Sequence, residues 1–161
     1  MADLNNLISP FFLNDKEIKK VIELFFFSYR DFTAGPDKVL EKLGFGRAHH
    51  RIIYFVGKKN NITIKELLVV LKITKQSLSR VLNQLVKEGF IVVSTGFDKR
   101  TKTLSLTKNG ITLENELSTI QINKIKTVIN NFNQEDINGF KKILFEMIEI
   151  DNRKTFQILN E

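Results

Sequence analysis

The chain of 161 residues contains no cysteine and no tryptophan, and it has only two prolines. Without a thiol, it can form no disulfide, thiolate zinc site, cysteine redox sensor or cysteine nucleophile. The absence of cysteine also fits a reducing compartment. With so little proline and fourteen phenylalanines, the composition predicts a mainly helical protein with a phenylalanine-packed interior.

Long apolar runs are missing as well. No uninterrupted run approaches the roughly 18 residues that a transmembrane helix requires. The opening residues, Met-Ala-Asp-Leu-Asn-Asn, lack the basic segment and apolar core of a signal peptide. We therefore expect a cytoplasmic protein with no membrane partner.

Catalytic and metal-binding patterns are also lacking. The only histidines, His49 and His50, are adjacent in a predicted helix, where successive side chains point about 100° apart. They cannot easily bind one metal ion together without other ligands. The chain has no nucleophile elbow and no phosphate-binding glycine loop. We expect no enzyme activity, no metal and no cofactor.

Acidic residues are scarce in the middle of the chain. Between Gly44 and Gly110 there are thirteen basic and three acidic side chains, a net charge of +10, which leaves −3 for the rest of a chain of net charge +7. A basic centre with slightly acidic ends is typical of a nucleic-acid-binding lobe on a neutral scaffold. A generally basic surface would spread the charge more evenly.

That basic region contains a helix, a turn and a second helix. Thr63-Ile-Lys-Glu66 matches a capping box, in which the two side chains bond to each other's backbone N–H. It opens a helix that is predicted to end near Lys72. Thr74 is the predicted N-cap of the next helix, which extends to Glu88, and Gly89 is its predicted left-handed C-cap.

Two short strands follow these helices. Phe90–Val93 is rich in β-branched residues, and Lys102–Leu106 alternates polar and apolar residues. The basic loop Thr95–Lys102 joins them as a hairpin. The fold class is therefore mainly α with a small β-hairpin wing, a winged helix-turn-helix. This arrangement places one helix in a DNA major groove and the wing beside it. Double-stranded DNA is the first partner to consider, transcriptional control the first function, and nucleoid association the expected location.

The rest of the chain is predicted to be helical, over about 15–33, 36–43, 47–56, 111–132 and 133–151. Asp15 and Asn133 are the expected N-caps of the first and last segments, and Ala34-Gly35-Pro36 is expected to break the chain between the first two. Around Leu24-Phe25-Phe26-Phe27 the first helix is apolar over most of its circumference. This pattern indicates a second buried face, against a partner helix or subunit.

The second helix of the helix-turn-helix carries the candidate base-reading residues. Leu78, Leu82, Leu85 and Val86 are predicted to point inward, and the face opposite Leu78, Leu82 and Leu85 is polar. Arginine can bond guanine and glutamine can bond adenine in the major groove, whereas hydroxyls and helix N-terminal amides suit phosphates. The alternatives are an ordinary solvated face and, for Arg80, a phosphate contact or a structural ion pair. The candidates on and near this helix are Thr63, Thr74, Lys75, Gln76, Ser77, Ser79, Arg80 and Asn83.

The wing supplies a second group of candidates. We expect Arg100 to enter the minor groove, where the narrow groove concentrates negative potential. Asp98 is expected to orient the Arg100 guanidinium or to hold the loop through charge-assisted hydrogen bonds. Lys99 and Lys102 suit phosphate contacts. The alternative is a solvated hairpin tip.

Three segments resemble the MarR family of bacterial regulators. Asp98-Lys99-Arg100 is similar to the family's D-x-R wing motif, Leu85–Ile91 to the exit of its recognition helix, and Leu106-Thr107-Lys-Asn-Gly110 to its L-T-x-x-G. The order of elements agrees over nearly the whole chain. Tyr29–Gly35 together with Gly44–Arg51 further resembles the PetP-like branch of alphaproteobacteria.

This resemblance implies a homodimer whose first and last helices interlock and whose two lobes reach successive major grooves of a pseudo-palindrome. It implies dimerisation helices in 1–43 and 111–161 and a DNA-binding lobe in 44–110. It also implies a small-molecule effector site between scaffold and lobe. The candidates for that site are Tyr29, Arg30, His49, His50 and Arg51. Their alternative role is structural or interdomain hydrogen bonding.

Two other functions fit the same fold. One is a non-catalytic protein-interaction module that has lost DNA binding. Arg80, Asp98, Arg100 and the basic centre argue against it. The other is an architectural protein that binds DNA without regard to sequence, which predicts a steep salt dependence with little discrimination.

Overall fold

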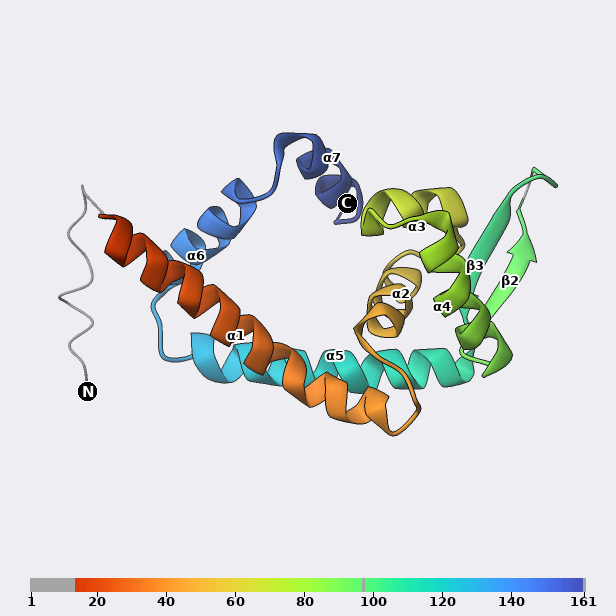
Figure 1. Cartoon of the computed structure of the whole chain (residues 1–161), viewed down its shortest axis with the longest axis horizontal. Coiled ribbons are helices and arrows are strands. Elements are labelled where there is room, and N and C mark those ends of the chain that lie inside the picture. Colours follow the sequence, from red (N-terminus) through yellow and green to blue (C-terminus); the bar gives the residue numbers. More distant parts are fainter. Residues whose placement is uncertain (1–13, 97, 161) are drawn as a thin grey trace. The chain divides into compact units, whose positions relative to one another are not determined.

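The computed structural model describes residues 14–96 and 98–160, shown as coloured ribbon in Figure 1. The chain divides into two compact units, Met1–Ala34 and Gly35–Glu161. The helices and strands in chain order are α1 (Asp15–Glu41), α2 (Arg47–Lys58), β1 (Ile62–Thr63), α3 (Ile64–Leu71), α4 (Lys75–Lys87), β2 (Ile91–Thr95), β3 (Lys102–Leu106), α5 (Lys108–Ile129), α6 (Gln134–Glu146) and α7 (Ile150–Ile158).

The first helix differs from the sequence prediction at two points. Its N-cap is Asn14 rather than Asp15, because Asn14 Oδ1 accepts hydrogen bonds of 3.1 Å from the backbone N–H groups of Lys16 and Glu17. The predicted break at Ala34-Gly35-Pro36 was wrong, since α1 continues through Pro36 to Glu41. A Cβ on Gly35 would lie 2.6 Å from Ile120 Cγ2 on α5, so this glycine allows a close approach of α5 instead of ending the helix.

The helix-turn-helix forms where the capping residues predicted it. Glu66 N–H donates to Thr63 Oγ1 over 3.1 Å, and Thr63 N–H donates to Glu66 Oε2 over 2.8 Å, which confirms the capping box of α3. Thr74 Oγ1 accepts a bond of 3.1 Å from Ser77 N–H and caps α4. Gly89 follows α4 with a φ of 77°, as expected for a left-handed C-cap.

The wing contains one strand more than predicted. β2 and β3 pair antiparallel with Ile91 opposite Leu106, and β1 pairs with the other edge of β3, with Ile62 opposite Leu104. β2 spans Ile91–Thr95, so it starts and ends later than the predicted strand at 90–93. The two-residue β1 ties the start of α3 to the wing, and it therefore fixes the helix-turn-helix and the hairpin as one body.

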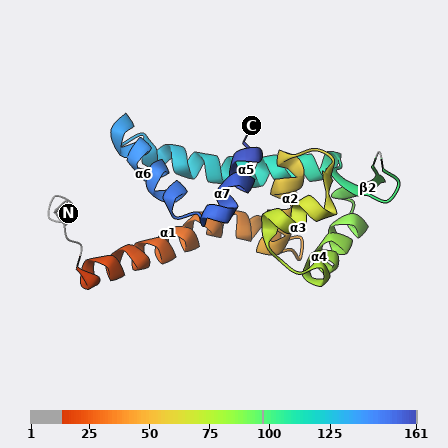
Figure 2. The ribbon, with the colours of Figure 1, turned by 90° about the horizontal axis from the view of Figure 1, so that it is seen from above.

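The core of the second unit is built around α2. This helix contacts α3, α4, α5 and β3, and Figures 1 and 2 show it between α5 and the helix-turn-helix. On α4, Val81 is buried at 8% exposure, whereas Val86 is 37% exposed. The prediction that Val86 points inward was therefore wrong. The side chains that α2 and α4 bury are Ile52, Ile53, Val56, Leu78, Val81, Leu82 and Leu85.

The C-terminal region forms three helices instead of two. Thr107 Oγ1 accepts from Gly110 N–H over 3.1 Å and caps α5, and α6 begins after its predicted N-cap, Asn133. The helix predicted to reach about Asp151 ends at Glu146, and α7 follows. The Arg153 guanidinium donates to the backbone oxygens of Glu146 and Ile148 over 2.9 and 3.0 Å and so stabilises this bend. None of the helices within residues 14–96 and 98–160 combines the length and the apolar character that a membrane span requires.

Candidate nucleic-acid interface

The outer face of α4 carries five of the predicted base-reading or phosphate-contacting side chains. All five are exposed and line one shallow hollow on the surface. The opposite face holds the buried row from Leu78 to Leu85, so the polar row cannot turn inward without exposing core residues. Within residues 14–96 and 98–160, no ion pair involves Arg80. The five are Lys75, Gln76, Ser79, Arg80 and Asn83.

The three hydroxyl residues near the starts of α3 and α4 take part in helix capping, Thr63 and Thr74 as N-caps and Ser77 as the donor to Thr74. Thr63 Oγ1 accepts from Glu66 N–H and donates to Glu66 Oε2 over 2.8 Å. Thr74 Oγ1 accepts from Ser77 N–H and donates to Ser77 Oγ over 2.9 Å. Thr74 and Ser77 are exposed, whereas Thr63 is half-buried. The phosphate contacts predicted for these residues stay predictions.

The loop of the wing is held by its own backbone and by Asp98. Asp98 Oδ1 accepts a hydrogen bond of 3.0 Å from Arg100 N–H, and the Asp98 carbonyl accepts one of 2.8 Å from Thr101 N–H. The carboxylate therefore closes an Asx turn, which corresponds to the loop-holding role expected for it. Asp98, Lys99, Arg100 and Lys102 are all exposed. Phe97, which lies in the predicted loop, is outside the described residues.

The imidazole of His49 links α2 with α4, a link that no pattern in the sequence indicated. His49 Nε2 lies 2.9 Å from Gln84 Oε1 on α4, and its Nδ1 accepts from Gly46 N–H over 3.1 Å. The imidazole stacks on the Phe45 ring with centroids 4.6 Å apart and planes 9° apart. Gln84 and Phe45 were not among the predicted functional residues. The partner of Gln84, His49, is 35 residues away in the sequence, whereas Phe45 lies four residues before His49. Both ring nitrogens of His49 have partners within the protein.

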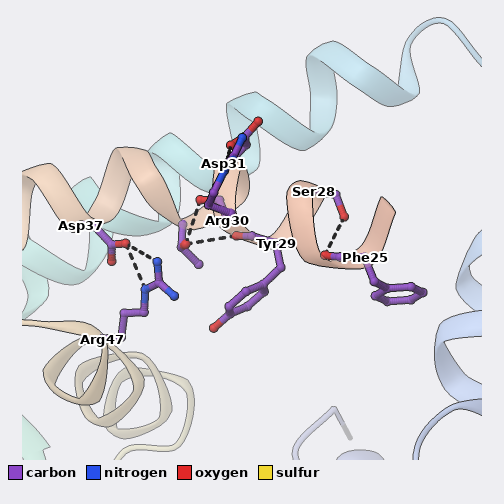
Figure 3. Close-up of polar contacts among 8 residues, drawn as sticks. Phe25, Ser28, Tyr29, Arg30, Asp31, Asp37 and Arg47 are labelled. Carbon is purple, nitrogen blue, oxygen red and sulfur yellow. Dashed lines mark hydrogen bonds and ion pairs between the residues drawn. The ribbon is translucent and has the colours of Figure 1, made fainter. Parts of the chain in front are cut away.

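His50 and Arg51 lie on the same helix in a charged setting. Burial lowers the pKa of His50, and this effect is opposed by the negative charges of Asp37 and Glu114 and reinforced by the positive charge of Arg51. Arg47 holds Asp37, with Nε and Nη2 at 3.0 and 2.8 Å from Asp37 Oδ2 (Figure 3). The other carboxylate oxygen, Asp37 Oδ1, is buried and has no hydrogen-bond partner in the described structure.

The remaining effector candidates, Tyr29 and Arg30, belong to the unit that ends at Ala34. Arg30 Nε donates to Asp31 over 2.8 Å, and its guanidinium lies 4.8 Å from the centre of the Phe27 ring (Figure 3 labels Arg30 and Asp31). Tyr29 is 46% exposed. Because these two residues and the α2 residues fall in different units, an effector site that includes all five stays a prediction.

A cleft of about 550 Å³ lies between α2, α3 and α7. Tyr54, Val69 and Phe156 are among its mostly apolar walls, and Lys58 donates to Asn160 over 3.2 Å across it. None of the five effector candidates lines this cleft. Its position does not match the effector site that the sequence predicted.

A basic winged helix-turn-helix with an exposed polar helix face defines a class of DNA-binding protein. The sequence model described as MarR family matches residues 43–101 of the chain. The chain is also 39% identical over 151 residues to the HTH-type transcriptional regulator PetP of Rhodobacter capsulatus, a match that covers 93% of this chain and 91% of that protein. The chain therefore belongs to the MarR family of transcriptional regulators, whose members are DNA-binding proteins and not enzymes.

Solved structures share the fold at lower sequence identity. Streptococcus pneumoniae FabT in complex with DNA superposes with a TM-score of 0.72 at 19% identity, over 81% of this chain and 94% of FabT. The S. aureus MepR–DNA complex superposes with a TM-score of 0.62 at 21% identity, over 78% of this chain and 94% of MepR. These two likenesses establish the winged-helix fold, which agrees with the sequence prediction.

Proposed function

We propose that this regulator binds a pseudo-palindromic DNA site as a homodimer and reads its bases with α4. The observation that carries the proposal is the outer face of α4, where five exposed polar side chains lie opposite a fully packed apolar row. Arg80 and Gln76 have the side chains best suited to guanine and adenine in the major groove. The shared fold with MepR and FabT, whose structures contain DNA, supports this use of the lobe.

The wing supplies the second contact in this proposal. Arg100 enters the minor groove, and Lys99 and Lys102 lie near phosphates. Asp98 supports them by holding the turn through the backbone of Arg100. The net charge of +10 between Gly44 and Gly110 supplies the sequence-independent attraction to the phosphates.

Exposed apolar side chains support dimerisation. On α1, Phe26 is 64% exposed and Leu24 is 64% exposed, and on α6 and the segment after it Ile143 and Met147 are each 60% exposed. Monomeric proteins rarely leave so many large apolar groups in water on neighbouring turns. We assign both ends of the chain, within 1–43 and 111–161, to the subunit interface. The exposed apolar residues at these ends include Ile18, Val21, Ile22, Leu24, Phe25, Phe26, Phe27, Ile122, Ile125, Val128, Phe132, Phe140, Ile143, Leu144, Met147, Ile150, Phe156 and Ile158.

Ligand control forms part of the same proposal. A small molecule that contacts Tyr29, Arg30, His50 or Arg51 would favour one spacing of the two lobes and so change DNA affinity by population shift. His49 is already bonded to Gly46 and Gln84, so we assign it to the framework of the lobe. We place the protein in the cytoplasm, associated with the nucleoid.

The test is to incubate the purified protein with fragments of its own genome, recover it, and sequence the retained DNA. Enrichment of a pseudo-palindrome with half-sites about one helical turn apart is the expected result. Uniform retention of all fragments that disappears at moderate salt would overturn sequence-specific binding and support an architectural role. Retention of no DNA, in the presence and absence of candidate effectors, would support a protein-interaction role.

A further inference from the structure

A hydrogen bond between α2 and α4 lies directly beside the proposed base-reading face. Gln84 follows Asn83 in the chain and lies one helical turn after Arg80. Its side-chain oxygen is 2.9 Å from His49 Nε2. From this placement, which rests on the function proposed above, we infer that His49 is a positioning residue: through Gln84 it fixes the rotation of α4 about its axis, and so the aim of Arg80 and Asn83.

The tautomer of His49 follows from its second partner. Gly46 N–H is a donor, so the Nδ1 that accepts it carries no hydrogen, and Nε2 carries the ring proton. Nε2–H therefore donates to Gln84 Oε1. The side-chain NH₂ of Gln84 takes no part in this bond. The backbone of the α1–α2 turn thus selects the tautomer of His49 that can donate to α4.

Two contacts hold the imidazole besides its bond to Gln84. It stacks flat on Phe45, which is only 8% exposed and meets the Phe90 ring edge-on at 5.3 Å. The backbone N–H of Phe45 donates to the Leu40 carbonyl over 2.9 Å. A ring fixed by stacking and by its Nδ1 bond loses little further entropy when it bonds Gln84, so it provides a stiff anchor for α4.

The His49–Gln84 hydrogen bond gives α4 a directional restraint that apolar packing does not provide. Leu78, Leu82 and Leu85 hold α4 against the core, but apolar contact has no preferred direction, and a small rotation of the helix changes it little. A hydrogen bond weakens steeply away from a straight geometry. Bidentate contacts to base edges demand the same accuracy, whereas contacts of lysine with phosphate tolerate displacement. Loss of the His49–Gln84 bond should therefore reduce sequence discrimination and leave general DNA affinity intact.

Two variants separate this role from simple packing. His49→Phe keeps a ring over Phe45 and removes both nitrogens, while Gln84→Met keeps the length of the side chain and removes its acceptor. Val86→Met introduces the same side chain at an exposed position of α4 that lies outside the proposed base-reading face and dimer interface, and it is the matched control. For each protein and for the double variant, the dissociation constants of the most enriched genomic duplex and of a shuffled duplex of equal composition are measured. Nitrogen NMR of the free protein reports the Nε2–H of His49.

We expect each single variant to lower the ratio of specific to shuffled affinity by roughly tenfold, within the range of one base contact. The double variant should lower it no further, and binding to the shuffled duplex should not change. Gln84→Met should weaken the Nε2–H signal of His49, and Val86→Met should leave every readout unchanged. If His49→Phe does not fold, Gln84→Met decides the question through the ratio and the signal.

Unchanged ratios in the variants of a discriminating wild-type protein would overturn the positioning role alone. Additive losses in the double variant would overturn it too, because they would show that the two residues act independently. A wild-type protein that cannot tell the two duplexes apart would overturn the proposed function together with this inference, and it would do so even with the Nε2–H signal present.

Discussion

The carboxylate of Asp98 accepts a hydrogen bond of 3.0 Å from the backbone N–H of Arg100, its neighbour two residues along the wing. The turn is thus held by the backbone of Arg100 and does not require its guanidinium. This division of roles explains how a carboxylate fits the tip of a basic wing that is proposed to face DNA. It also separates the two chemical properties of Asp98, its acceptor oxygen and its charge.

Asp98→Asn and Asp98→Ala should therefore have opposite effects. Asparagine keeps the oxygen that closes the turn and removes a negative charge near phosphates, so we expect DNA affinity equal to or higher than wild type. Alanine loses the turn contact, and we expect several-fold weaker binding. Fluorescence anisotropy with one labelled duplex measures both. Equal affinities for the two variants would contradict a role for the turn.

Arg80→Ala is expected to cost about 1–3 kcal/mol at the specific site and to relax its sequence preference. Arg80→Lys is the sharper comparison, because it keeps the charge and loses the planar fork that bonds guanine. We expect this variant to keep the salt dependence of binding and to lose discrimination among duplexes. If Arg80→Lys discriminates as wild type does, Arg80 contacts phosphate instead of bases.

Arg100→Ala should weaken binding to specific and random duplexes alike. One lost phosphate or minor-groove contact lowers the slope of log affinity against log salt by about 1. The slope is measured from dissociation constants at several salt concentrations. Lys154→Ala, which removes an exposed charge from α7, is the control and should leave the slope unchanged. A slope in Arg100→Ala equal to that of the control would remove the wing contact from the proposal.

The elements predicted well from the sequence are those that local chemistry specifies. The capping box of Thr63 and Glu66, the cap at Thr74 and the left-handed Gly89 each depend on atoms within a few residues. The strand Lys102–Leu106 was predicted with its observed bounds because its alternation has one buried face. Helical periodicity alone predicted the exposed face of α4. In the buried row, Val81 is buried where Val86 was predicted to be.

The features that were missed depend on contacts between distant segments. β1 has two residues and exists because β3 lies beside it. Gly35 indicated a break, but its role is set by Ile120 on α5. The end of α6 has no proline or glycine and depends on Arg153 from the next helix. The bond between His49 and Gln84 joins residues 35 apart, so no local pattern could predict it.

Gly110→Ala should destabilise the lobe. A Cβ on Gly110 would overlap the Phe90 carbonyl oxygen, which also accepts from Thr107 N–H over 3.0 Å. Because that oxygen is fixed by the backbone, we expect a loss of about 1–3 kcal/mol in the free energy of unfolding. Gly139→Ala on α6 is the matched control, since its new Cβ meets no atom within 4 Å. It should stabilise the helix by about 0.5–1 kcal/mol. Urea unfolding measures the change in the free energy of unfolding for each variant. A change of the same sign in both variants would contradict this account.

The last prediction concerns acid stability and Glu66. A hydrogen bond from the Lys59 ammonium, at 2.8 Å, and one from Thr63 N–H lower the pKa of Glu66 from 4.5 to about 2. A carboxyl group with a lowered pKa in the folded state stabilises the protein fully above its unfolded pKa. It loses that contribution as the pH falls toward the folded value. The window for Glu66 is therefore from about pH 4.5 down to about 2.

Glu66→Gln keeps the shape of the capping box and removes the charge, so it should unfold more easily than wild type at pH 7. The difference should shrink as the pH falls through this window. Because the Glu66 side chain is 44% exposed, water screens the pair, and the difference should stay at the low end of about 0.5–2 kcal/mol. Lys59→Met should remove most of the pH dependence of stability that Glu66 contributes. Lys65→Met, the same change at a neighbouring exposed lysine, should keep it. Urea titrations at pH 7, 4.5 and 3 measure this, and a constant gap between wild type and Glu66→Gln would show that the charge of Glu66 contributes nothing to folding.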